Sequence, residues 1–281
     1  MNFHSDEYIM DRLREHYGEA LKYFDKNQIV GLFLQGSQNY GLDYENSDID
    51  TKLIVVPSFK DIAMNKAAVS TTHIMPNEEH IDFKDIRLYM QCFKKQNINF
   101  VEILYTPYKI INPLYEQFWK ELENQREAIT HCNELAAVTC MKGTASEKYF
   151  ALEHKYPSKI EIIERFGYDP KQLHHLVRMK YFIKNYIEGK RYAECLVNDD
   201  DILNQLLCIK TGVFGHGDAI KLAEETYKEI CDIYNGYKEA NPEAKIDKTV
   251  LDLLDKIQYK IMETAVITEF SDKLLLSKNK T

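Results

Sequence analysis

At 281 residues the chain can form one large domain or two small ones, each with a substantial core. Its hydrophobic share of 44% and charged share of 28% are ordinary for a soluble globular protein, and no apolar run reaches the ~18 residues of a membrane span. The formal net charge of −8 argues against binding to extended duplex DNA. Scattered cysteines without a Cys-x-x-Cys pair, and no secretory h-region, predict a cytoplasmic protein.

Strands and helices alternate in the first part of the chain. Ile9, Leu13, Tyr17 and Leu21 recur at helical spacing, which predicts a helix within residues 3–26. Two apolar runs flank a polar loop, and the second follows Asp48 and Asp50, so we expect a strand that opens on these carboxylates. The remaining elements expected here are a strand at 28–34, a helix at 59–67, strands at 71–75 and 80–85, and a helix at 86–96.

From about residue 112 the pattern is helical. We therefore predict an α+β fold: a small mixed sheet with flanking helices in a domain at 1–110, then an all-helical domain at 111–281. Gly143 is expected to interrupt the second of these helices. The helices expected are 112–124, 128–153, 158–166, 171–189, 200–210, 217–237 and 247–268.

The loop between the two apolar runs carries the residues best suited to chemistry. Gly36 lets the backbone approach a ligand, its neighbouring N–H groups can hold a phosphate, and Ser37 adds a hydroxyl donor. Asp48 and Asp50 are two apart and share one face of a strand. Two carboxylates this close favour a hard divalent cation, Mg²⁺ or Mn²⁺. A phosphate cradle beside an acidic metal site indicates phosphoryl or nucleotidyl transfer.

Gly36-Ser37, ten residues and Asp48-Ile49-Asp50 resemble the signature of the DNA polymerase β-like nucleotidyltransferase superfamily. The longer string with Tyr40-Gly-Leu-Asp and Ser-Asp-Ile-Asp resembles its branch of predicted bacterial and phage nucleotidyltransferases, also labelled an RNA-repair-associated polymerase β family. The resemblance implies a nucleotidyltransferase sheet domain and a helical domain that completes the cleft. It also implies that Asp48 and Asp50 are catalytic metal ligands.

A third carboxylate is expected on the strand at 80–85. Asp82 alternates with the apolar Ile81 and Phe83, so it should face away from them. The superfamily places its third metal ligand on such a strand, and Asp82 is the matching position. Glu79 is the alternative, and Asp85 suits the N-cap of the next helix.

Further binding residues are expected in the loop and on the helix at 171–189. Tyr40 could stack on a base or simply cover its loop. His175-Leu-Val-Arg178 resembles the family's helical-domain motif, and with His174 these cations would grip the triphosphate or an acceptor phosphate. A buried histidine beside a salt-bridged arginine is the structural alternative.

The predicted activity is transfer of a nucleoside monophosphate from an NTP, with ATP expected, to an acceptor hydroxyl with release of pyrophosphate. Gly36, Ser37, Tyr40, His175 and Arg178 would bind the nucleotide, and Asp82 or a metal would activate the hydroxyl. The acceptor is an RNA 3′ end, a protein side chain or a small molecule. A catalytically inactive nucleotide-binding or toxin-neutralising module, and a two-metal phosphohydrolase, are the rival classes.

Overall fold

The computed structural model describes residues 3–45, 47–243 and 245–278. The chain divides into two compact units. The first comprises residues 1–39, 43–132 and 247–281, and the second comprises residues 40–42 and 133–246. This division differs from the single boundary expected near residue 110, because residues 111–132 and the C-terminal helix belong to the first unit.

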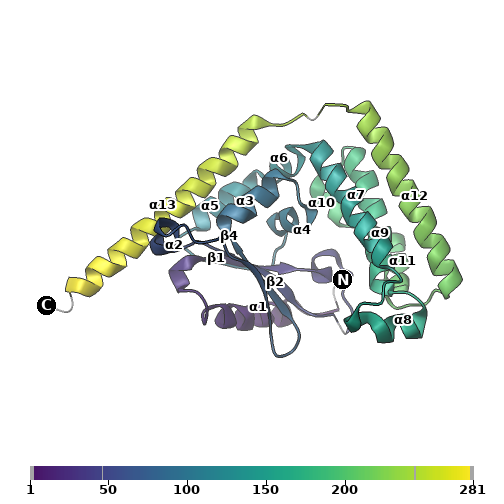
Figure 1. The fold of residues 1–281 in the computed structure, drawn as a ribbon, viewed down its shortest axis with the longest axis horizontal. Helices are drawn as coiled ribbons and strands as arrows, with labels where there is room; N and C mark the ends of the chain where they lie inside the picture. The colour runs from purple at the N-terminus through teal and green to yellow at the C-terminus, as the bar shows by residue number, and fades with distance from the viewer. Residues whose placement is uncertain (1–2, 46, 244, 279–281) are drawn as a thin grey trace. The chain divides into compact units, whose positions relative to one another are not determined.

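The first unit is built on a mixed sheet, which the described residues form from five strands in the order β3-β4-β2-β1-β5 (Figure 1). β2 and β4 are parallel, and the other neighbouring pairs are antiparallel. The sheet confirms the predicted α+β class. The sheet also contains β5, which the sequence did not predict, because three residues are too few to show the alternation of a strand. The strands are β1 (Ile29–Gln35), β2 (Asp50–Val55), β3 (Ser70–Ile74), β4 (His80–Asp85) and β5 (Lys109–Ile111).

One face of the sheet packs on α1 (Asp6–Ala20). Ile9 and Leu13 of this helix are fully buried with Leu32 and Ile81 of the sheet, as their helical spacing predicted. The helix ends at Ala20, earlier than expected, and Leu21 is 43% exposed instead of lying in the core. Alternate strand residues therefore supply the α1 side of the core.

Helices from distant parts of the sequence cover the other face. Phe33 of β1 packs on Trp119, with ring centroids 4.2 Å apart. The C-terminal helix α13 contacts α3 and α5, and Lys94 forms an ion pair with Asp255. The other helices of this unit are α2 (Phe59–Ala63), α3 (Ile86–Lys94), α4 (Ile98–Val101), α5 (Glu116–Asn124), α6 (Arg126–His131) and α13 (Lys248–Lys278), with 3₁₀ turns at Lys26–Gln28, Ser37–Tyr40 and Glu102–Leu104.

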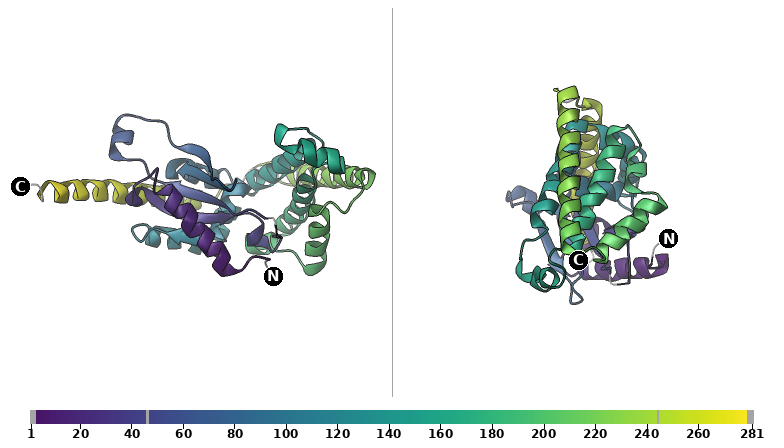
Figure 2. Two further views of the ribbon diagram at one scale, coloured as in Figure 1. Left: turned by 90° about the horizontal axis from the view of Figure 1, so that it is seen from below. Right: turned by 90° about the vertical axis from the view of Figure 1, so that its right-hand side faces the viewer.

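The described part of the second unit is helical. Its long helices α7, α9 and α12 pack against one another (Figures 1 and 2). Gly143 lies inside α7, so the expected interruption there is wrong; the predicted helix instead breaks between α6 and α7. Asp169 caps α9. The helices are α7 (Glu134–Ala151), α8 (Ile160–Phe166), α9 (Pro170–Ile187), α10 (Tyr192–Leu196), α11 (Asp200–Lys210) and α12 (His216–Ala240), with a 3₁₀ turn at Pro157–Lys159.

None of the helices in the described ranges is both long and apolar enough to cross a membrane.

Candidate active site

The glycine turn and the two aspartates lie at the same end of the β1–β2 pair. Gln35, the last residue of β1, pairs with Asp50, the first residue of β2. Gly36 follows with a φ of +118°, a conformation that favours glycine, and turns the chain away from the strand. The Gln38 side chain then donates from Nε2 to the Asp48 carbonyl at 2.8 Å. The turn is thus held directly beside the aspartates.

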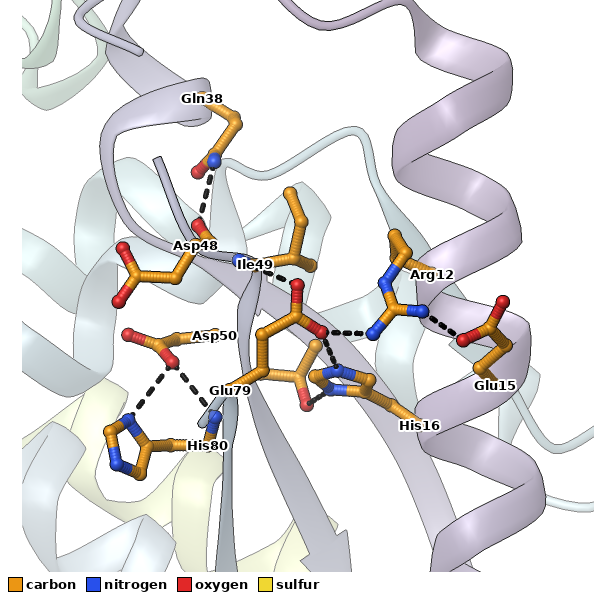
Figure 3. A network of polar contacts seen from close by, with 10 residues as sticks. Arg12, Glu15, His16, Gln38, Asp48, Ile49, Asp50, Glu79 and His80 are labelled. Carbon is orange, nitrogen blue, oxygen red and sulfur yellow. Dashed lines mark hydrogen bonds and ion pairs between the residues drawn. The ribbon is translucent and has the colours of Figure 1, made fainter. Parts of the chain in front are cut away.

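Asp48 and Asp50 flank a residue that is fixed in the core. Ile49 is fully buried, whereas Asp48 is exposed and Asp50 is half-buried. Both carboxylates project to the same side of the chain (Figure 3). The i, i+2 spacing and the burial of Ile49 together explain this arrangement, although Asp48 itself lies just before the strand.

His80 holds the Asp50 carboxylate. The His80 backbone N–H donates to Asp50 Oδ1 at 2.9 Å, and the ring Nδ1 lies 3.2 Å from the same oxygen (Figure 3). His80 is the first residue of β4, the strand parallel to β2. One residue therefore contacts Asp50 with both its backbone and its ring.

Asp82 lies on the expected face but beside a lysine. Its alternation with buried Ile81 and Phe83 is confirmed by the burial along β4. In the parallel register Asp82 pairs with Lys52, and Lys52 Nζ lies 3.4 Å from Asp82 Oδ2. Burial lowers the pKa of Lys52, although the carboxylates of Asp82 and Glu102 favour its charged form. The arrangement therefore gives Asp82 a cationic partner from the protein itself.

The aspartate pair fits a divalent cation better than the predicted trio does. Carboxylate oxygens are the ligands that Mg²⁺ and Mn²⁺ prefer, and within the described residues no hydrogen bond or ion pair engages the Asp48 carboxylate. Over the same residues, no three His, Cys, Asp or Glu side chains are grouped to hold a metal. The Asp48 carboxylate is open to a cation, whereas Asp50 would share its carboxylate with His80, and Asp82 would share its carboxylate with Lys52.

Glu79 is buried beneath the aspartates and does not face the expected metal position. Its Oε2 lies 2.8 Å from His16 Nε2 and accepts from Arg12, and its Oε1 lies 3.3 Å from the Ile49 backbone nitrogen (Figure 3). Burial alone would raise the pKa of Glu79, but the hydrogen bonds from His16 and Arg12 lower it to about 2. The ionised carboxylate is therefore engaged by protein donors.

Tyr40, His175 and Arg178 belong to the second unit. The Arg178 guanidinium stacks on the Tyr40 ring, 3.7 Å from its centroid, and Tyr40 is only 6% exposed. Of the two roles considered for Tyr40, covering its loop describes this arrangement. Arg178 forms no ion pair with any residue that the structure describes, so the salt bridge of the structural alternative is not formed, and the guanidinium makes a cation–π contact instead.

The paired histidines of α9 are neutral. Burial lowers the pKa of His174 to about 3, and His174 Nδ1 lies 3.0 Å from the Leu206 carbonyl. Burial, together with the charges of Arg178 and Lys171, holds the pKa of His175 well below its usual range. Neither ring carries the positive charge that the sequence suggested for gripping phosphate, so Arg178 is the cation of this motif.

Sequence reasoning missed several polar residues of the site. His16 occupies a position of the apolar stripe of α1, three residues after Leu13, and this misfit was the available signal. Lys52 shares the strand face of Asp50 by alternation. Gln38 is 2% exposed and braces the loop. No pattern in the sequence indicates the partners of these side chains.

No protein-family profile and no curated protein matches the chain. Among solved structures, the chain is similar to a nucleotidyltransferase-like protein from Exiguobacterium sibiricum 255-15, with 11% identity and a TM-score of 0.30. The match covers 92% of this chain and 77% of the other. At this level of similarity the activity has to be inferred from this chain's own residues.

Proposed function

We propose that this chain is a metal-dependent nucleotidyltransferase. One observation carries the proposal: the β1–β2 register and the bond from Gln38 to the Asp48 carbonyl hold a glycine-serine turn beside two same-sided carboxylates. A backbone turn that can take phosphate and an acidic pair that can take a divalent cation are the two parts that transfer of a nucleotidyl group requires.

The residues have separate roles. Gly36 and Ser37 bind the β- and γ-phosphates of the NTP. Among the described residues, no side chain or backbone group forms a hydrogen bond with the Ser37 hydroxyl. Asp48 and Asp50 hold Mg²⁺ or Mn²⁺, with ATP as the expected substrate. When bound, the metal neutralises charge on the entering and leaving oxygens. Asp82 would join the site as a third ligand while Lys52 Nζ lies 3.4 Å from its Oδ2.

The reaction joins the acceptor to the α-phosphorus. The acceptor hydroxyl oxygen forms a bond to the α-phosphorus, the bond from that phosphorus to the bridging oxygen breaks, and pyrophosphate leaves. The hydroxyl proton passes to a site carboxylate or to solvent. An RNA 3′ end, a protein side chain and a small hydroxylated molecule are the acceptor classes to test.

In the second unit, Arg178 is the proposed phosphate ligand. Its guanidinium lies over the Tyr40 ring and has no carboxylate partner among the described residues, so it can still pair with an anion. Within the same proposal, His175 contributes a neutral ring and Tyr40 positions the guanidinium. These roles are independent of the carboxylate chemistry.

The test is nucleotide transfer from each of four α-³²P-labelled NTPs, with Mg²⁺ or Mn²⁺, into total cellular RNA or total protein. Label should enter one pool with matching pyrophosphate release, and the Asp48→Ala/Asp50→Ala variant should lose both. Asp11→Ala, which removes an exposed aspartate of α1, is the matched control. Inorganic phosphate in place of pyrophosphate would indicate a phosphohydrolase.

A catalytically inactive nucleotide-binding module is the second candidate. It is favoured by the pairing of Asp82 with Lys52, which leaves two carboxylates for the cation. NTP binding that survives the double substitution, without incorporation or pyrophosphate from any acceptor pool, would support this candidate over the enzyme.

A further inference from the structure

The peptide group between Asp48 and Ile49 is held at both ends by side chains. Its carbonyl, on Asp48, accepts from Gln38 Nε2 at 2.8 Å. Its N–H, on Ile49, donates to Glu79 Oε1 at 3.3 Å (Figure 3). This peptide lies just before β2 begins, so the sheet ladder does not satisfy it. Two side chains therefore supply the hydrogen bonds that a strand would otherwise provide.

Glu79 is itself anchored to the core. It is 5% exposed, and its other oxygen contacts Arg12 and the fully buried His16. His16 Nδ1 lies 2.8 Å from the hydroxyl of Thr51, the residue after Asp50. Contacts thus run from α1 through Glu79 to the Ile49 backbone, and from His16 directly to the Thr51 side chain, on the two sides of Asp50.

Clamping this peptide fixes the directions of both carboxylates. The Ile49 side chain is buried, and with the peptide held on both sides the backbone of Asp48 has little freedom to rotate. Outer contacts of this kind orient the residues that bind a metal. A carboxylate whose two oxygens already face protein donors is poorly placed to be a ligand itself.

We propose that Glu79 is a positioning residue that, with Gln38, holds the Asp48–Ile49 peptide so that Asp48 and Asp50 present their carboxylates to one divalent cation. The cation in this inference rests on the proposed function. The two hydrogen bonds that hold the Asp48–Ile49 peptide do not depend on that function. It also replaces the sequence-based alternative that Glu79 is a metal ligand.

The test compares two substitutions of Glu79 by Mn²⁺ binding, followed by electron paramagnetic resonance on the full chain. Glu79→Gln keeps an oxygen that can accept from the Ile49 N–H but turns an NH₂ group toward Arg12 and His16, so its Mn²⁺ affinity should fall clearly less than that of Glu79→Ala. Glu79→Ala removes the acceptor, and its affinity should fall by about tenfold or more, as for loss of an outer-shell contact. Glu15→Ala is the matched control, because Glu15 also contacts Arg12 but does not contact Ile49.

Hydrogen exchange at the Ile49 amide separates the clamp from the cation. Without metal, this amide should exchange faster in Glu79→Ala than in Glu79→Gln or Glu15→Ala. If Glu79→Ala does not fold, Gln38→Leu removes the other end of the clamp and should weaken Mn²⁺ binding in the same way.

Three results would overturn the inference. Equal losses of Mn²⁺ affinity in Glu79→Gln and Glu79→Ala would mean that Glu79 acts through its negative charge or as a direct metal ligand. Unchanged affinity and exchange in a folded Glu79→Ala chain would make the contact dispensable. Wild-type protein that binds no Mn²⁺ would refute both the cation role and the proposed function, and a fast-exchanging Ile49 amide in Glu79→Ala would then still establish the clamp alone.

Discussion

Asp50 and His80 form a two-point contact at the edge of the site. Asp50 Oδ1 receives the His80 backbone N–H at 2.9 Å, and the His80 ring Nδ1 lies 3.2 Å from the same oxygen. The backbone contact persists with any residue except proline at position 80, whereas the ring contact competes with any cation for the carboxylate. The two contacts can therefore be separated by substitution.

Replacing His80 by alanine should preserve or tighten Mn²⁺ binding. The backbone N–H still orients Asp50, and the competing ring donor is lost. Mn²⁺ titration followed by electron paramagnetic resonance measures the effect. A loss of about tenfold or more would instead mean that the ring supports metal binding, since losing an outer contact of a ligand costs about that much.

Asp82→Asn should destabilise the protein by about 2 kcal/mol, because buried Lys52 loses its ionised partner. Urea unfolding measures the loss. In the double variant Lys52→Met/Asp82→Asn the stability should recover, because neither charge remains. Nucleotide transfer should not recover if Asp82 takes part in the reaction; full activity in the stable double variant would make Asp82 a structural residue.

Gly36→Ala should cost about 1–2 kcal/mol, since a φ of +118° disfavours any residue with a Cβ. The new Cβ would also lie 3.3 Å from Gln38 Oε1, so the brace on the Asp48 carbonyl should be disturbed and NTP affinity should fall. Gly143→Ala is the matched control, because nothing lies within 4 Å of its new Cβ inside α7. That substitution should stabilise the chain by about 0.5–1 kcal/mol.

His174 predicts a loss of stability in acid. Its pKa is about 3 in the folded protein and near 6.5 when unperturbed, so the unfolded chain takes up a proton first as the pH falls. The contribution is complete above about pH 6.5 and declines toward pH 3, by at most about 1.4 kcal/mol per pH unit. His174→Asn can still donate to the Leu206 carbonyl but does not titrate. Between about pH 3 and pH 6.5, the unfolding free energy of this variant should change less with pH than that of the wild type, because up to one proton fewer is taken up on unfolding. Identical slopes in the two proteins would contradict a lowered pKa for His174.

Arg178→Met should weaken NTP binding without unfolding the protein, because Met retains apolar packing on Tyr40 but loses the charge. Equilibrium binding of a fluorescent ATP analogue measures the change. Tyr40→Leu should have a smaller effect, since it frees the guanidinium but leaves its charge. Unaltered affinity in both variants would remove the second unit from nucleotide binding.

The sequence predicted most elements of the fold because their patterns are local. The alternation in β4 was correct, and the stripe of α1 was correct at Ile9 and Leu13 but not at Leu21, which is exposed beyond the end of the helix. The association of α13 with the first unit was missed, since no local pattern specifies a partner more than a hundred residues away.

The candidate site was predicted as a set of residue types, and its contacts were not. Spacing placed Asp48 and Asp50 on one side, but the register that sets Asp82 against Lys52 depends on how two separate strands align. The neutrality of His174 and His175 depends on burial by other helices, which no motif encodes.

Because α13 belongs to the first unit but follows the second unit in the sequence, the two units are completed in a fixed order during synthesis. Residues 133–246, with the earlier segment 40–42, are all present before α13 has been made. The ribosome therefore delivers the complete second unit while the sheet still lacks the helix that packs on α3 and α5. The aspartate pair is translated early, but the unit that carries it is completed last.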